Sequence, residues 1–225
     1  MPLVPMVVKR IPGEGERAMD IYSRLLDERI IMLTSDFNDD MASLIVSQLL
    51  YLQSEDSTKD ITMYINSPGG SVTSMWSIVD TMNLISCDVS TVCIGMAASA
   101  GSVVVAAGTK GKRFMLPHSK IMIHQPSFGV QGMVSDVEIS YKESLKTKEL
   151  LHDFMAEKTG QTVAQITKDM DRDTWFTAIE SLNYGLVDKI IKGKEDKETT
   201  KENPKETPKT TKPEGKNNIV KTGRK

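Results

Sequence analysis

Short apolar stretches alternate with longer amphipathic stretches along the first half of the chain. Three apolar stretches have the length and composition of buried strands: 29–34 (RIIMLT), 61–66 (ITMYIN) and 89–94 (VSTVCI). Three stretches with helical periodicity follow them in turn: 38–53, 71–85 and 99–108. The pairs recur about every 30 residues, the length of a strand–helix–strand crossover. The pattern therefore predicts an α/β domain whose sheet is mainly parallel and covered by helices.

A long helical pattern dominates the second half. Two further strand-like stretches, 112–116 and 120–126, precede it, and the pattern runs from about Val134 to Lys158. Its apolar positions keep rough helical spacing while the other face is charged: Val137, Tyr141, Leu145, Leu151 and Phe154. A helix of this length projects about 30 Å or more, which exceeds what the core of a small domain needs. We therefore expect it to be an oligomerisation arm.

The end of the folded part is marked by local signals. Thr177 and Glu180 have the spacing of a capping box, and Gly185 is placed to end that helix before a strand-like LVDKII. From Gly193 the composition changes to Lys, Glu, Thr and Pro with few apolar residues. Such a segment buries too little surface to offset its ordering entropy. Residues 193–225 are predicted to be a disordered tail, with a docking motif around Ile219 and Val220 as the alternative.

Charge and cysteine content narrow the classes of function. The formal net charge of -2 gives no argument for binding nucleic acid or an anionic membrane surface. Cys87 and Cys93 have neither the spacing of a metal site nor the density of a disulfide scaffold, which suits a reducing cytosol. The N-terminal sequence lacks the features of a secretory signal, and no apolar run reaches the length of a membrane span. We expect a cytoplasmic protein, with an organelle stroma or matrix left open.

One serine and one glycine-rich loop lie where catalytic groups are often found. Ser99 falls between a predicted strand and a predicted helix, and its neighbours are small enough for a tight turn that presents a nucleophile. Close helix packing explains the same small residues. The stretch 65–72 (INSPGGSV) also joins a strand to a helix, and its glycines permit outward N–H groups such as an oxyanion hole needs, although an ordinary capped loop fits as well. The stretch 106–113 lacks the residues of a Walker A motif, so no ATP hydrolysis is expected.

Three histidines and three aspartates are candidates for the proton-transfer groups. His152 lies in the charged helix and His118 in a turn, so both are expected at the surface, whereas His124 ends an apolar strand and suits a general base. The segment KDMDRDTWFTA offers three acids: Asp169, Asp171 and Asp173. Spacing alone does not choose among them, and a solvated acidic turn is the default.

Taken together, these stretches closely resemble the proteolytic subunits of the Clp protease, a family of self-compartmentalised serine peptidases. The matching strings include GERAMDIYSRLLDERIIML, YINSPGGSVT, CIGMAASAGS, GTKGKRFMLPHSKIMIHQP and DMDRDTWFTAIESLNYGLVD, in the order of the family and over essentially residues 3–191. The resemblance implies a ClpP/crotonase-like spiral of repeated ββα units with a protruding handle helix. It implies three catalytic roles and two oxyanion donors: Ser99 as nucleophile, His124 as general base, Asp171 as orienting acid, and the N–H groups of Gly70 and Ala100.

The resemblance also implies an organisation and a set of partners. We expect an N-terminal axial segment at 1–18, a peptidase domain at 19–192 and a handle at about 125–159, in which the strand FGVQG precedes the long helix. The handle would join two heptameric rings into a tetradecamer. Unfolded proteins would be delivered by an AAA+ unfoldase of the Clp family, which uses the ATP. No cofactor, metal, nucleic acid or membrane is expected for this chain.

Two other classes of function remain as alternatives. One is a catalytically inactive ring subunit that serves as a scaffold, although such subunits typically lack a member of the triad. The other is a crotonase-like acyl-CoA enzyme, which shares the implied fold and uses backbone oxyanion holes but needs no serine nucleophile.

Overall fold

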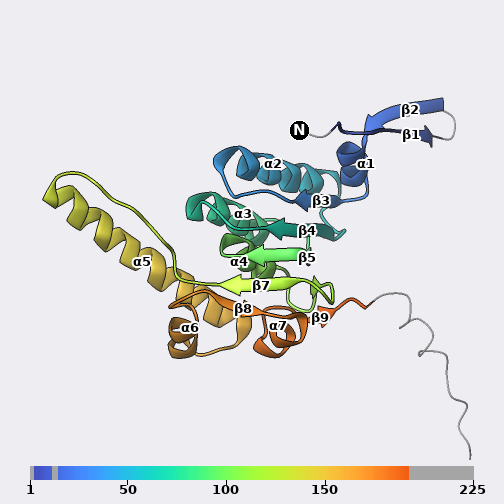
Figure 1. The fold of residues 1–225 in the computed structure, drawn as a ribbon. Helices are drawn as coiled ribbons and strands as arrows, with labels where there is room; N and C mark the ends of the chain where they lie inside the picture. The colour runs from blue at the N-terminus through green and yellow to red at the C-terminus, as the bar shows by residue number, and fades with distance from the viewer. Residues whose placement is uncertain (1–2, 12–14, 193–225) are drawn as a thin grey trace, which may run out of the picture. The chain divides into compact units, whose positions relative to one another are not determined.

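The computed structural model describes residues 3–11 and 15–192 (Figure 1). The predicted tail at 193–225 lies outside the described residues. The first described elements are two strands, β1 (Met6–Ile11) and β2 (Gly15–Asp20), which pair with each other in antiparallel fashion. The second strand ends two residues after residue 18, where the N-terminal axial segment was expected to end. Asp20 then caps helix α1 (Ile21–Asp27), because its carboxylate accepts hydrogen bonds from the N–H groups of Tyr22 and Ser23.

A seven-stranded sheet forms the centre of the folded unit. Its strands are β3 (Ile30–Leu33), β4 (Ile61–Ser67), β5 (Val89–Ala98), β6 (Arg113–Met115), β7 (Lys120–Ile123), β8 (Thr174–Phe176) and β9 (Lys189–Ile190). The order is β3-β4-β5-β6-β9, all parallel, while β7 also lies parallel to β5 and antiparallel to β8. The prediction of a mixed α/β fold with a mainly parallel sheet is confirmed.

Strand β5 is shared between two parts of the sheet. Its first half, Thr91–Cys93, pairs with β6, and its last residues, Met96–Ala98, pair with β7. Gly95 lies between the two halves with φ +66°, a conformation that suits glycine, and the register against β4 shifts in the same region. The end of β5 therefore lies beside β7, which in turn pairs with β8.

Three helices follow the parallel strands in the predicted order. They are α2 (Asp39–Glu55), α3 (Val72–Leu84) and α4 (Ala100–Ala107). Helix α4 consists only of small and β-branched residues, and every one of its side chains is buried. Because no bulky residue lies on it, α4 packs against α3 and the sheet at once.

The long helix α5 (Val134–Thr159) comprises 26 residues and extends away from the sheet (Figure 1). Its buried side chains all lie near its C-terminal end: Leu151, His152, Met155, Ala156 and Thr159. Apolar residues nearer its start are exposed, among them Ile139 and Tyr141. The expected extent of the helix is confirmed to within one residue, whereas the expected strand FGVQG is not seen: the structure assigns no strand between Ile123 and Val134.

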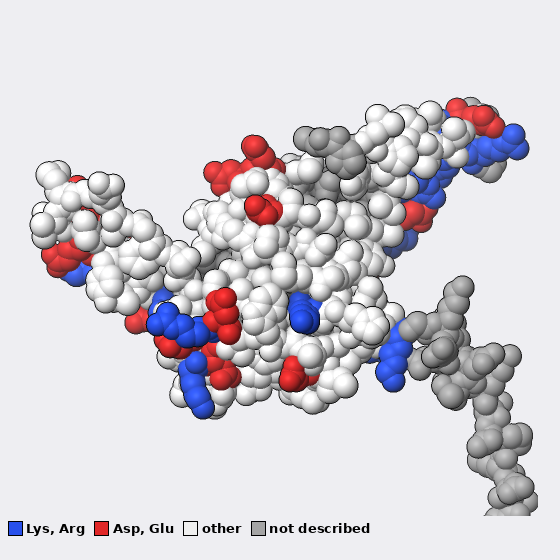
Figure 2. Space-filling view, viewed as in Figure 1, with Lys and Arg blue, Asp and Glu red and all other residues white. Residues whose placement is uncertain are grey.

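Two short helices, α6 (Val163–Asp169) and α7 (Ala178–Tyr184), complete the unit. The capping box of Thr177 and Glu180 is present, and Gly185 ends α7 with φ +92°, as predicted. Arg113 is buried and donates to Asp188 through Nε and Nη2, while its Nη1 donates to the carbonyl of Lys158. This pair ties β6 to the end of α5 and to β9. On the face shown in Figure 2, acidic and basic side chains are interspersed.

Candidate active site

Ser99 lies at a strained turn between β5 and α4. Its φ of 54° and ψ of -122° place a non-glycine residue in a sparsely populated region, and among the described residues only Arg29 shares a positive φ without being glycine. The N–H of Ser99 donates to the carbonyl of Met122 on β7 at 2.9 Å. The turn is therefore held by the neighbouring strand, and this combination of a sharp turn and a serine is typical of a presented nucleophile.

The glycine-rich loop packs directly against this serine. Gly69 has φ +105°, and a Cβ built on it would lie 2.6 Å from the Cβ of Ser99 and 3.1 Å from its Oγ. Only glycine fits both the backbone conformation and the close approach. The SPGG loop and Ser99 therefore lie side by side.

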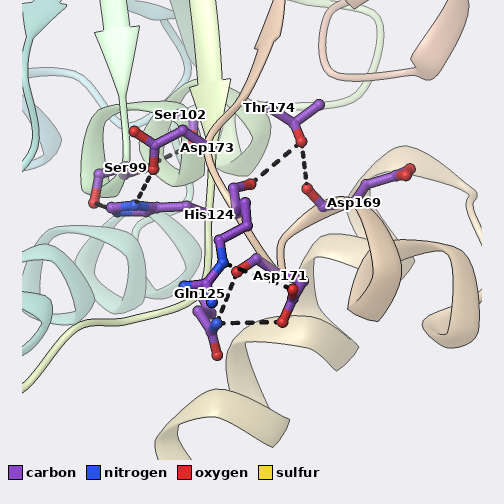
Figure 3. Close-up of polar contacts among 9 residues, drawn as sticks. Ser99, Ser102, His124, Gln125, Asp169, Asp171, Asp173 and Thr174 are labelled. Carbon is purple, nitrogen blue, oxygen red and sulfur yellow. Dashed lines mark hydrogen bonds and ion pairs between the residues drawn. The ribbon is translucent and has the colours of Figure 1, made fainter.

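His124 links Ser99 to an aspartate (Figure 3). Its Nε2 lies 2.9 Å from Ser99 Oγ, and its Nδ1 lies 3.0 Å from Asp173 Oδ1. A carboxylate only accepts hydrogen bonds, so Nδ1 carries the proton and Nε2 is free to accept the serine proton. The three side chains form a continuous hydrogen-bonded path, with His124 partly buried between the two others.

The expectation that Asp171 orients His124 is corrected by this geometry. Strands β7 and β8 pair Ile123 with Thr174, so the next residues outward, His124 and Asp173, lie opposite each other. Asp171 lies two residues earlier, in the loop after α6, where its Oδ1 is 3.4 Å from the side-chain nitrogen of Gln125. The pairing of KIMI with TWF is the signal in the sequence that could have identified Asp173.

The two expected oxyanion donors lie beside the serine. Ala100 is the first residue of α4, so its N–H has no acceptor within the helix. Gly70 has φ +145°, and the loop around it is fixed by the bonds from Phe37 N–H to the carbonyl of Gly69 and from Ser71 N–H to the carbonyl of Phe37. Neither the N–H of Gly70 nor that of Ala100 takes part in the hydrogen bonds found among the described residues. Their role as oxyanion donors stays a prediction.

A small cavity beside the catalytic groups is continued by a larger groove along α5. A small cavity of about 20 Å³ lies against Ser99 and His124 and is walled by Val72, Pro126 and Leu151. A larger groove of about 390 Å³ continues from Val72 and Pro126 between the segment 126–128 and α5. The lining of both is largely apolar near the serine, with the hydroxyls of Ser140, Ser144 and Thr147 further along α5.

The remaining histidines and cysteines are remote from this chemistry. His118 is exposed, as expected, but the expectation that His152 lies at the surface is wrong. His152 is buried where α5 meets α6, its Nδ1 is 3.1 Å from Thr167 Oγ1, and burial together with nearby Lys148 lowers its pKa. Both cysteines are free thiols, as predicted, and burial raises the pKa of Cys93 to about 12. In the described ranges, no group of three or more His, Cys, Asp or Glu side chains could hold a metal ion.

The arrangement of Ser99, His124 and Asp173 on this α/β fold is that of a serine hydrolase. The model of the Clp protease family matches residues 13–194. The chain is also 52% identical over 195 residues to an ATP-dependent Clp protease proteolytic subunit from Ligilactobacillus salivarius strain UCC118. The aligned residues make up 87% of this chain and 98% of that protein. The chain therefore belongs to the Clp protease family, a family of peptidases. None of its described helices combines the length and apolar character that a bilayer span requires.

Proposed function

We propose that this chain is a serine endopeptidase subunit in which Ser99 is the nucleophile, His124 the general base and Asp173 the orienting acid. One observation carries the proposal: the unbroken path from Asp173 Oδ1 through both nitrogens of His124 to Ser99 Oγ, with contacts of 3.0 and 2.9 Å. The shorter distance is within reach of direct proton transfer from Ser99 to His124, and the other lets Asp173 hold the imidazole in the required tautomer. The strained backbone of Ser99 directs its hydroxyl into this path.

The reaction follows from the roles of these atoms. Nε2 of His124 takes the hydroxyl proton as Ser99 Oγ attacks the peptide carbonyl, and Asp173 stabilises the imidazolium that forms. The N–H groups of Gly70 and Ala100 would stabilise the oxyanion. The imidazolium then gives its proton to the leaving amine, which departs and leaves an acyl-enzyme. Water, deprotonated by His124, releases the acid product and restores Ser99.

Substrate would bind as an extended peptide between two segments of backbone. The glycine loop at 68–71 packs against Ser99, and the segment after His124 pairs with no described strand. Main-chain hydrogen bonds to both would hold the peptide in register, as in strand addition. The groove along Val72, Pro126 and α5 would receive side chains near the cleaved bond.

Assembly would confine this activity. The exposed apolar residues on the first part of α5, such as Val134, Ile139 and Tyr141, support a role for this handle in joining two heptameric rings. The relative from Ligilactobacillus salivarius is named as the proteolytic subunit of an ATP-dependent protease. On that basis we propose that an AAA+ unfoldase delivers unfolded protein and uses the ATP, while this chain needs no cofactor. We place the complex in the cytoplasm.

Labelling with a fluorophosphonate tests the nucleophile. The assembled protein, identified by its native mass, should be labelled at Ser99 and should hydrolyse a short fluorogenic peptide. Ser99→Ala should abolish both. Ser47→Ala is the matched control, because this exposed serine on α2 bonds only the carbonyl of Ser43 and should leave both signals intact. Assembled protein that is not labelled would contradict the peptidase mechanism and would favour the inactive scaffold or the crotonase-like enzyme, neither of which needs a serine nucleophile.

A further inference from the structure

The two chain segments that carry His124 and Asp173 leave the β-ladder at the same point. Asp173 is the last residue of the loop 170–173, here called the acid loop, and its side chain is 62% exposed. An exposed side chain is held by few contacts of its own. Its position against His124 therefore depends on how the backbone of the acid loop is fixed.

Gln125, the residue after the general base, bonds the acid loop twice through backbone carbonyls. Its N–H donates to the carbonyl of Met170, and its Nε2 donates to the carbonyl of Asp171 at 2.8 Å. These bonds extend the contact between the two segments beyond the last strand pair, Ile123 with Thr174. Gln125 thus continues the contact between the two segments past the pair of His124 and Asp173.

The amide of Gln125 is itself oriented by the handle. Nζ of Lys148, on α5, donates to Oε1 of Gln125 at 2.8 Å. An ammonium group only donates, so Oε1 must face Lys148 and Nε2 must face the acid loop. Hydrogen bonds with a charged donor are roughly twice as strong as neutral ones, and both residues are partly buried. The amide is therefore satisfied at both ends in one orientation.

The far side of the acid loop has a separate support. Thr174 Oγ1 donates to the carbonyl of Asp169 at 2.6 Å, and Tyr184 OH donates to the carboxylate of Asp169 at 2.7 Å. The acid loop is thus anchored at its two ends by Asp169 and Thr174 and in its middle by Gln125. Besides the contact of Asp173 with His124 itself, the bonds of Gln125 join it to the segment that carries the general base.

We propose that Gln125 is a positioning residue for His124 and Asp173, and that Lys148 of the handle helix fixes the orientation of its amide. The proposal rests on the proposed function of Ser99, His124 and Asp173. In this proposal Lys148, which does not line the substrate groove, affects the relative position of His124 and Asp173 through its bond to Gln125. Small displacements of a catalytic pair have large effects on rate, because the productive geometry is narrow.

The test compares three variants with the wild type in assembled particles of confirmed native mass. Gln125→Leu removes the amide and keeps much of its volume, Lys148→Met removes the charge and keeps the length, and Lys148→Arg restores a charged donor. Lys146→Met is the matched control, because Lys146 is an exposed handle lysine that bonds Glu143 instead. The readouts are kcat and KM for a short peptide and the rate constant for inactivation by a small fluorophosphonate, which needs no substrate groove.

Gln125→Leu should lower kcat and the inactivation rate constant together by about 100-fold with KM little changed. Lys148→Met should lower both by about 10-fold, Lys148→Arg should restore them, and Lys146→Met should match the wild type. The proposal is overturned if assembled Gln125→Leu and Lys148→Met retain wild-type rates, or if only KM changes. If Gln125→Leu fails to assemble, the lysine variants decide. Failure of the proposed function would differ, because the wild type itself would then be neither labelled nor active.

Discussion

Replacement of Asp173 by asparagine separates the observed acid from the acid that the sequence suggested. Asp173→Asn keeps the shape of the side chain but removes its charge from the 3.0 Å contact with His124 Nδ1. Two unit charges about 4 Å apart interact by about 4 kcal/mol at an effective dielectric constant of 20. The imidazolium formed in the reaction would lose that stabilisation, although solvent screens part of it because Asp173 is 62% exposed.

A second effect of the substitution acts in the same direction. The amide of asparagine can donate to Nδ1 and so stabilise the tautomer in which Nε2 carries the proton and cannot accept one from Ser99. In other triads this substitution lowers kcat by about 10⁴-fold. With screening and tautomer taken together, we expect kcat to fall on the order of 10³-fold, since each factor of ten corresponds to about 1.4 kcal/mol.

The assay is peptide hydrolysis by particles of confirmed native mass, with Asp171→Asn measured beside Asp173→Asn. Asparagine at position 171 keeps an oxygen that can accept from Gln125 Nε2, and the main contact of Gln125 is to the backbone carbonyl. Asp171→Asn should therefore change kcat of assembled particles by less than about 10-fold. The reasoning is refuted if Asp173→Asn stays within 10-fold of the wild type, or if assembled Asp171→Asn loses activity to the same extent as Asp173→Asn.

Two further predictions concern Gly69 and Asp188. Gly69→Ala places a Cβ 2.6 Å from that of Ser99 and should reduce fluorophosphonate labelling by about 100-fold, with unchanged circular dichroism. Gly111→Ala is the matched control, because Gly111 also has a positive φ, +86°, but no atom lies within 4 Å of the new Cβ. This control variant should be labelled normally. Burial opposes the charge of Asp188, but the hydrogen bonds and charge of Arg113 outweigh it and lower the pKa of Asp188 to about 2. Folding stability from this group should be nearly complete above pH 5, and about 2 kcal/mol should be lost as the pH falls through 2, measured by urea denaturation. Asp188→Asn should remove this pH dependence and cost about 3 kcal/mol; an unchanged acid limb would contradict the assignment.

Periodicity was enough to predict the elements that carry the site. The strand before Ser99 and the helix after it are continuous in sequence, and their apolar residues are buried on both sides, so local pattern and tertiary burial agree. The capping box and the glycine at the end of α7 are equally local signals, and both are present. These predictions hold because the physical cause lies within a few residues of the feature.

The incorrect predictions depend on contacts between distant segments. Asp171 and Asp173 have the same chemistry and differ only in which one faces β7, and that choice is made by the register of β8 against β7. His152 lies in a charged helix, yet it is buried because α6 folds back onto the last turns of α5. The segment FGVQG has the composition of a strand but no strand partner among the described residues. Pairing and packing, which a single segment does not encode, decided each case.

The strain at Ser99 is explained by the same long-range contacts. A serine with φ of 54° would relax in an isolated turn, but its N–H is bonded to Met122 and Gly69 leaves no space for it to move away. Met122 in turn pairs with Trp175 on β8, one residue inside the pair of Ile123 and Thr174. One set of hydrogen bonds therefore runs from the nucleophile through β7 to the strand that follows Asp173. The base directly follows β7 and the acid directly precedes β8, so the distances of 2.9 and 3.0 Å are consequences of strand register. Gln125 extends that register by one residue, which is why a side chain that touches no reacting atom is expected to control the reaction rate.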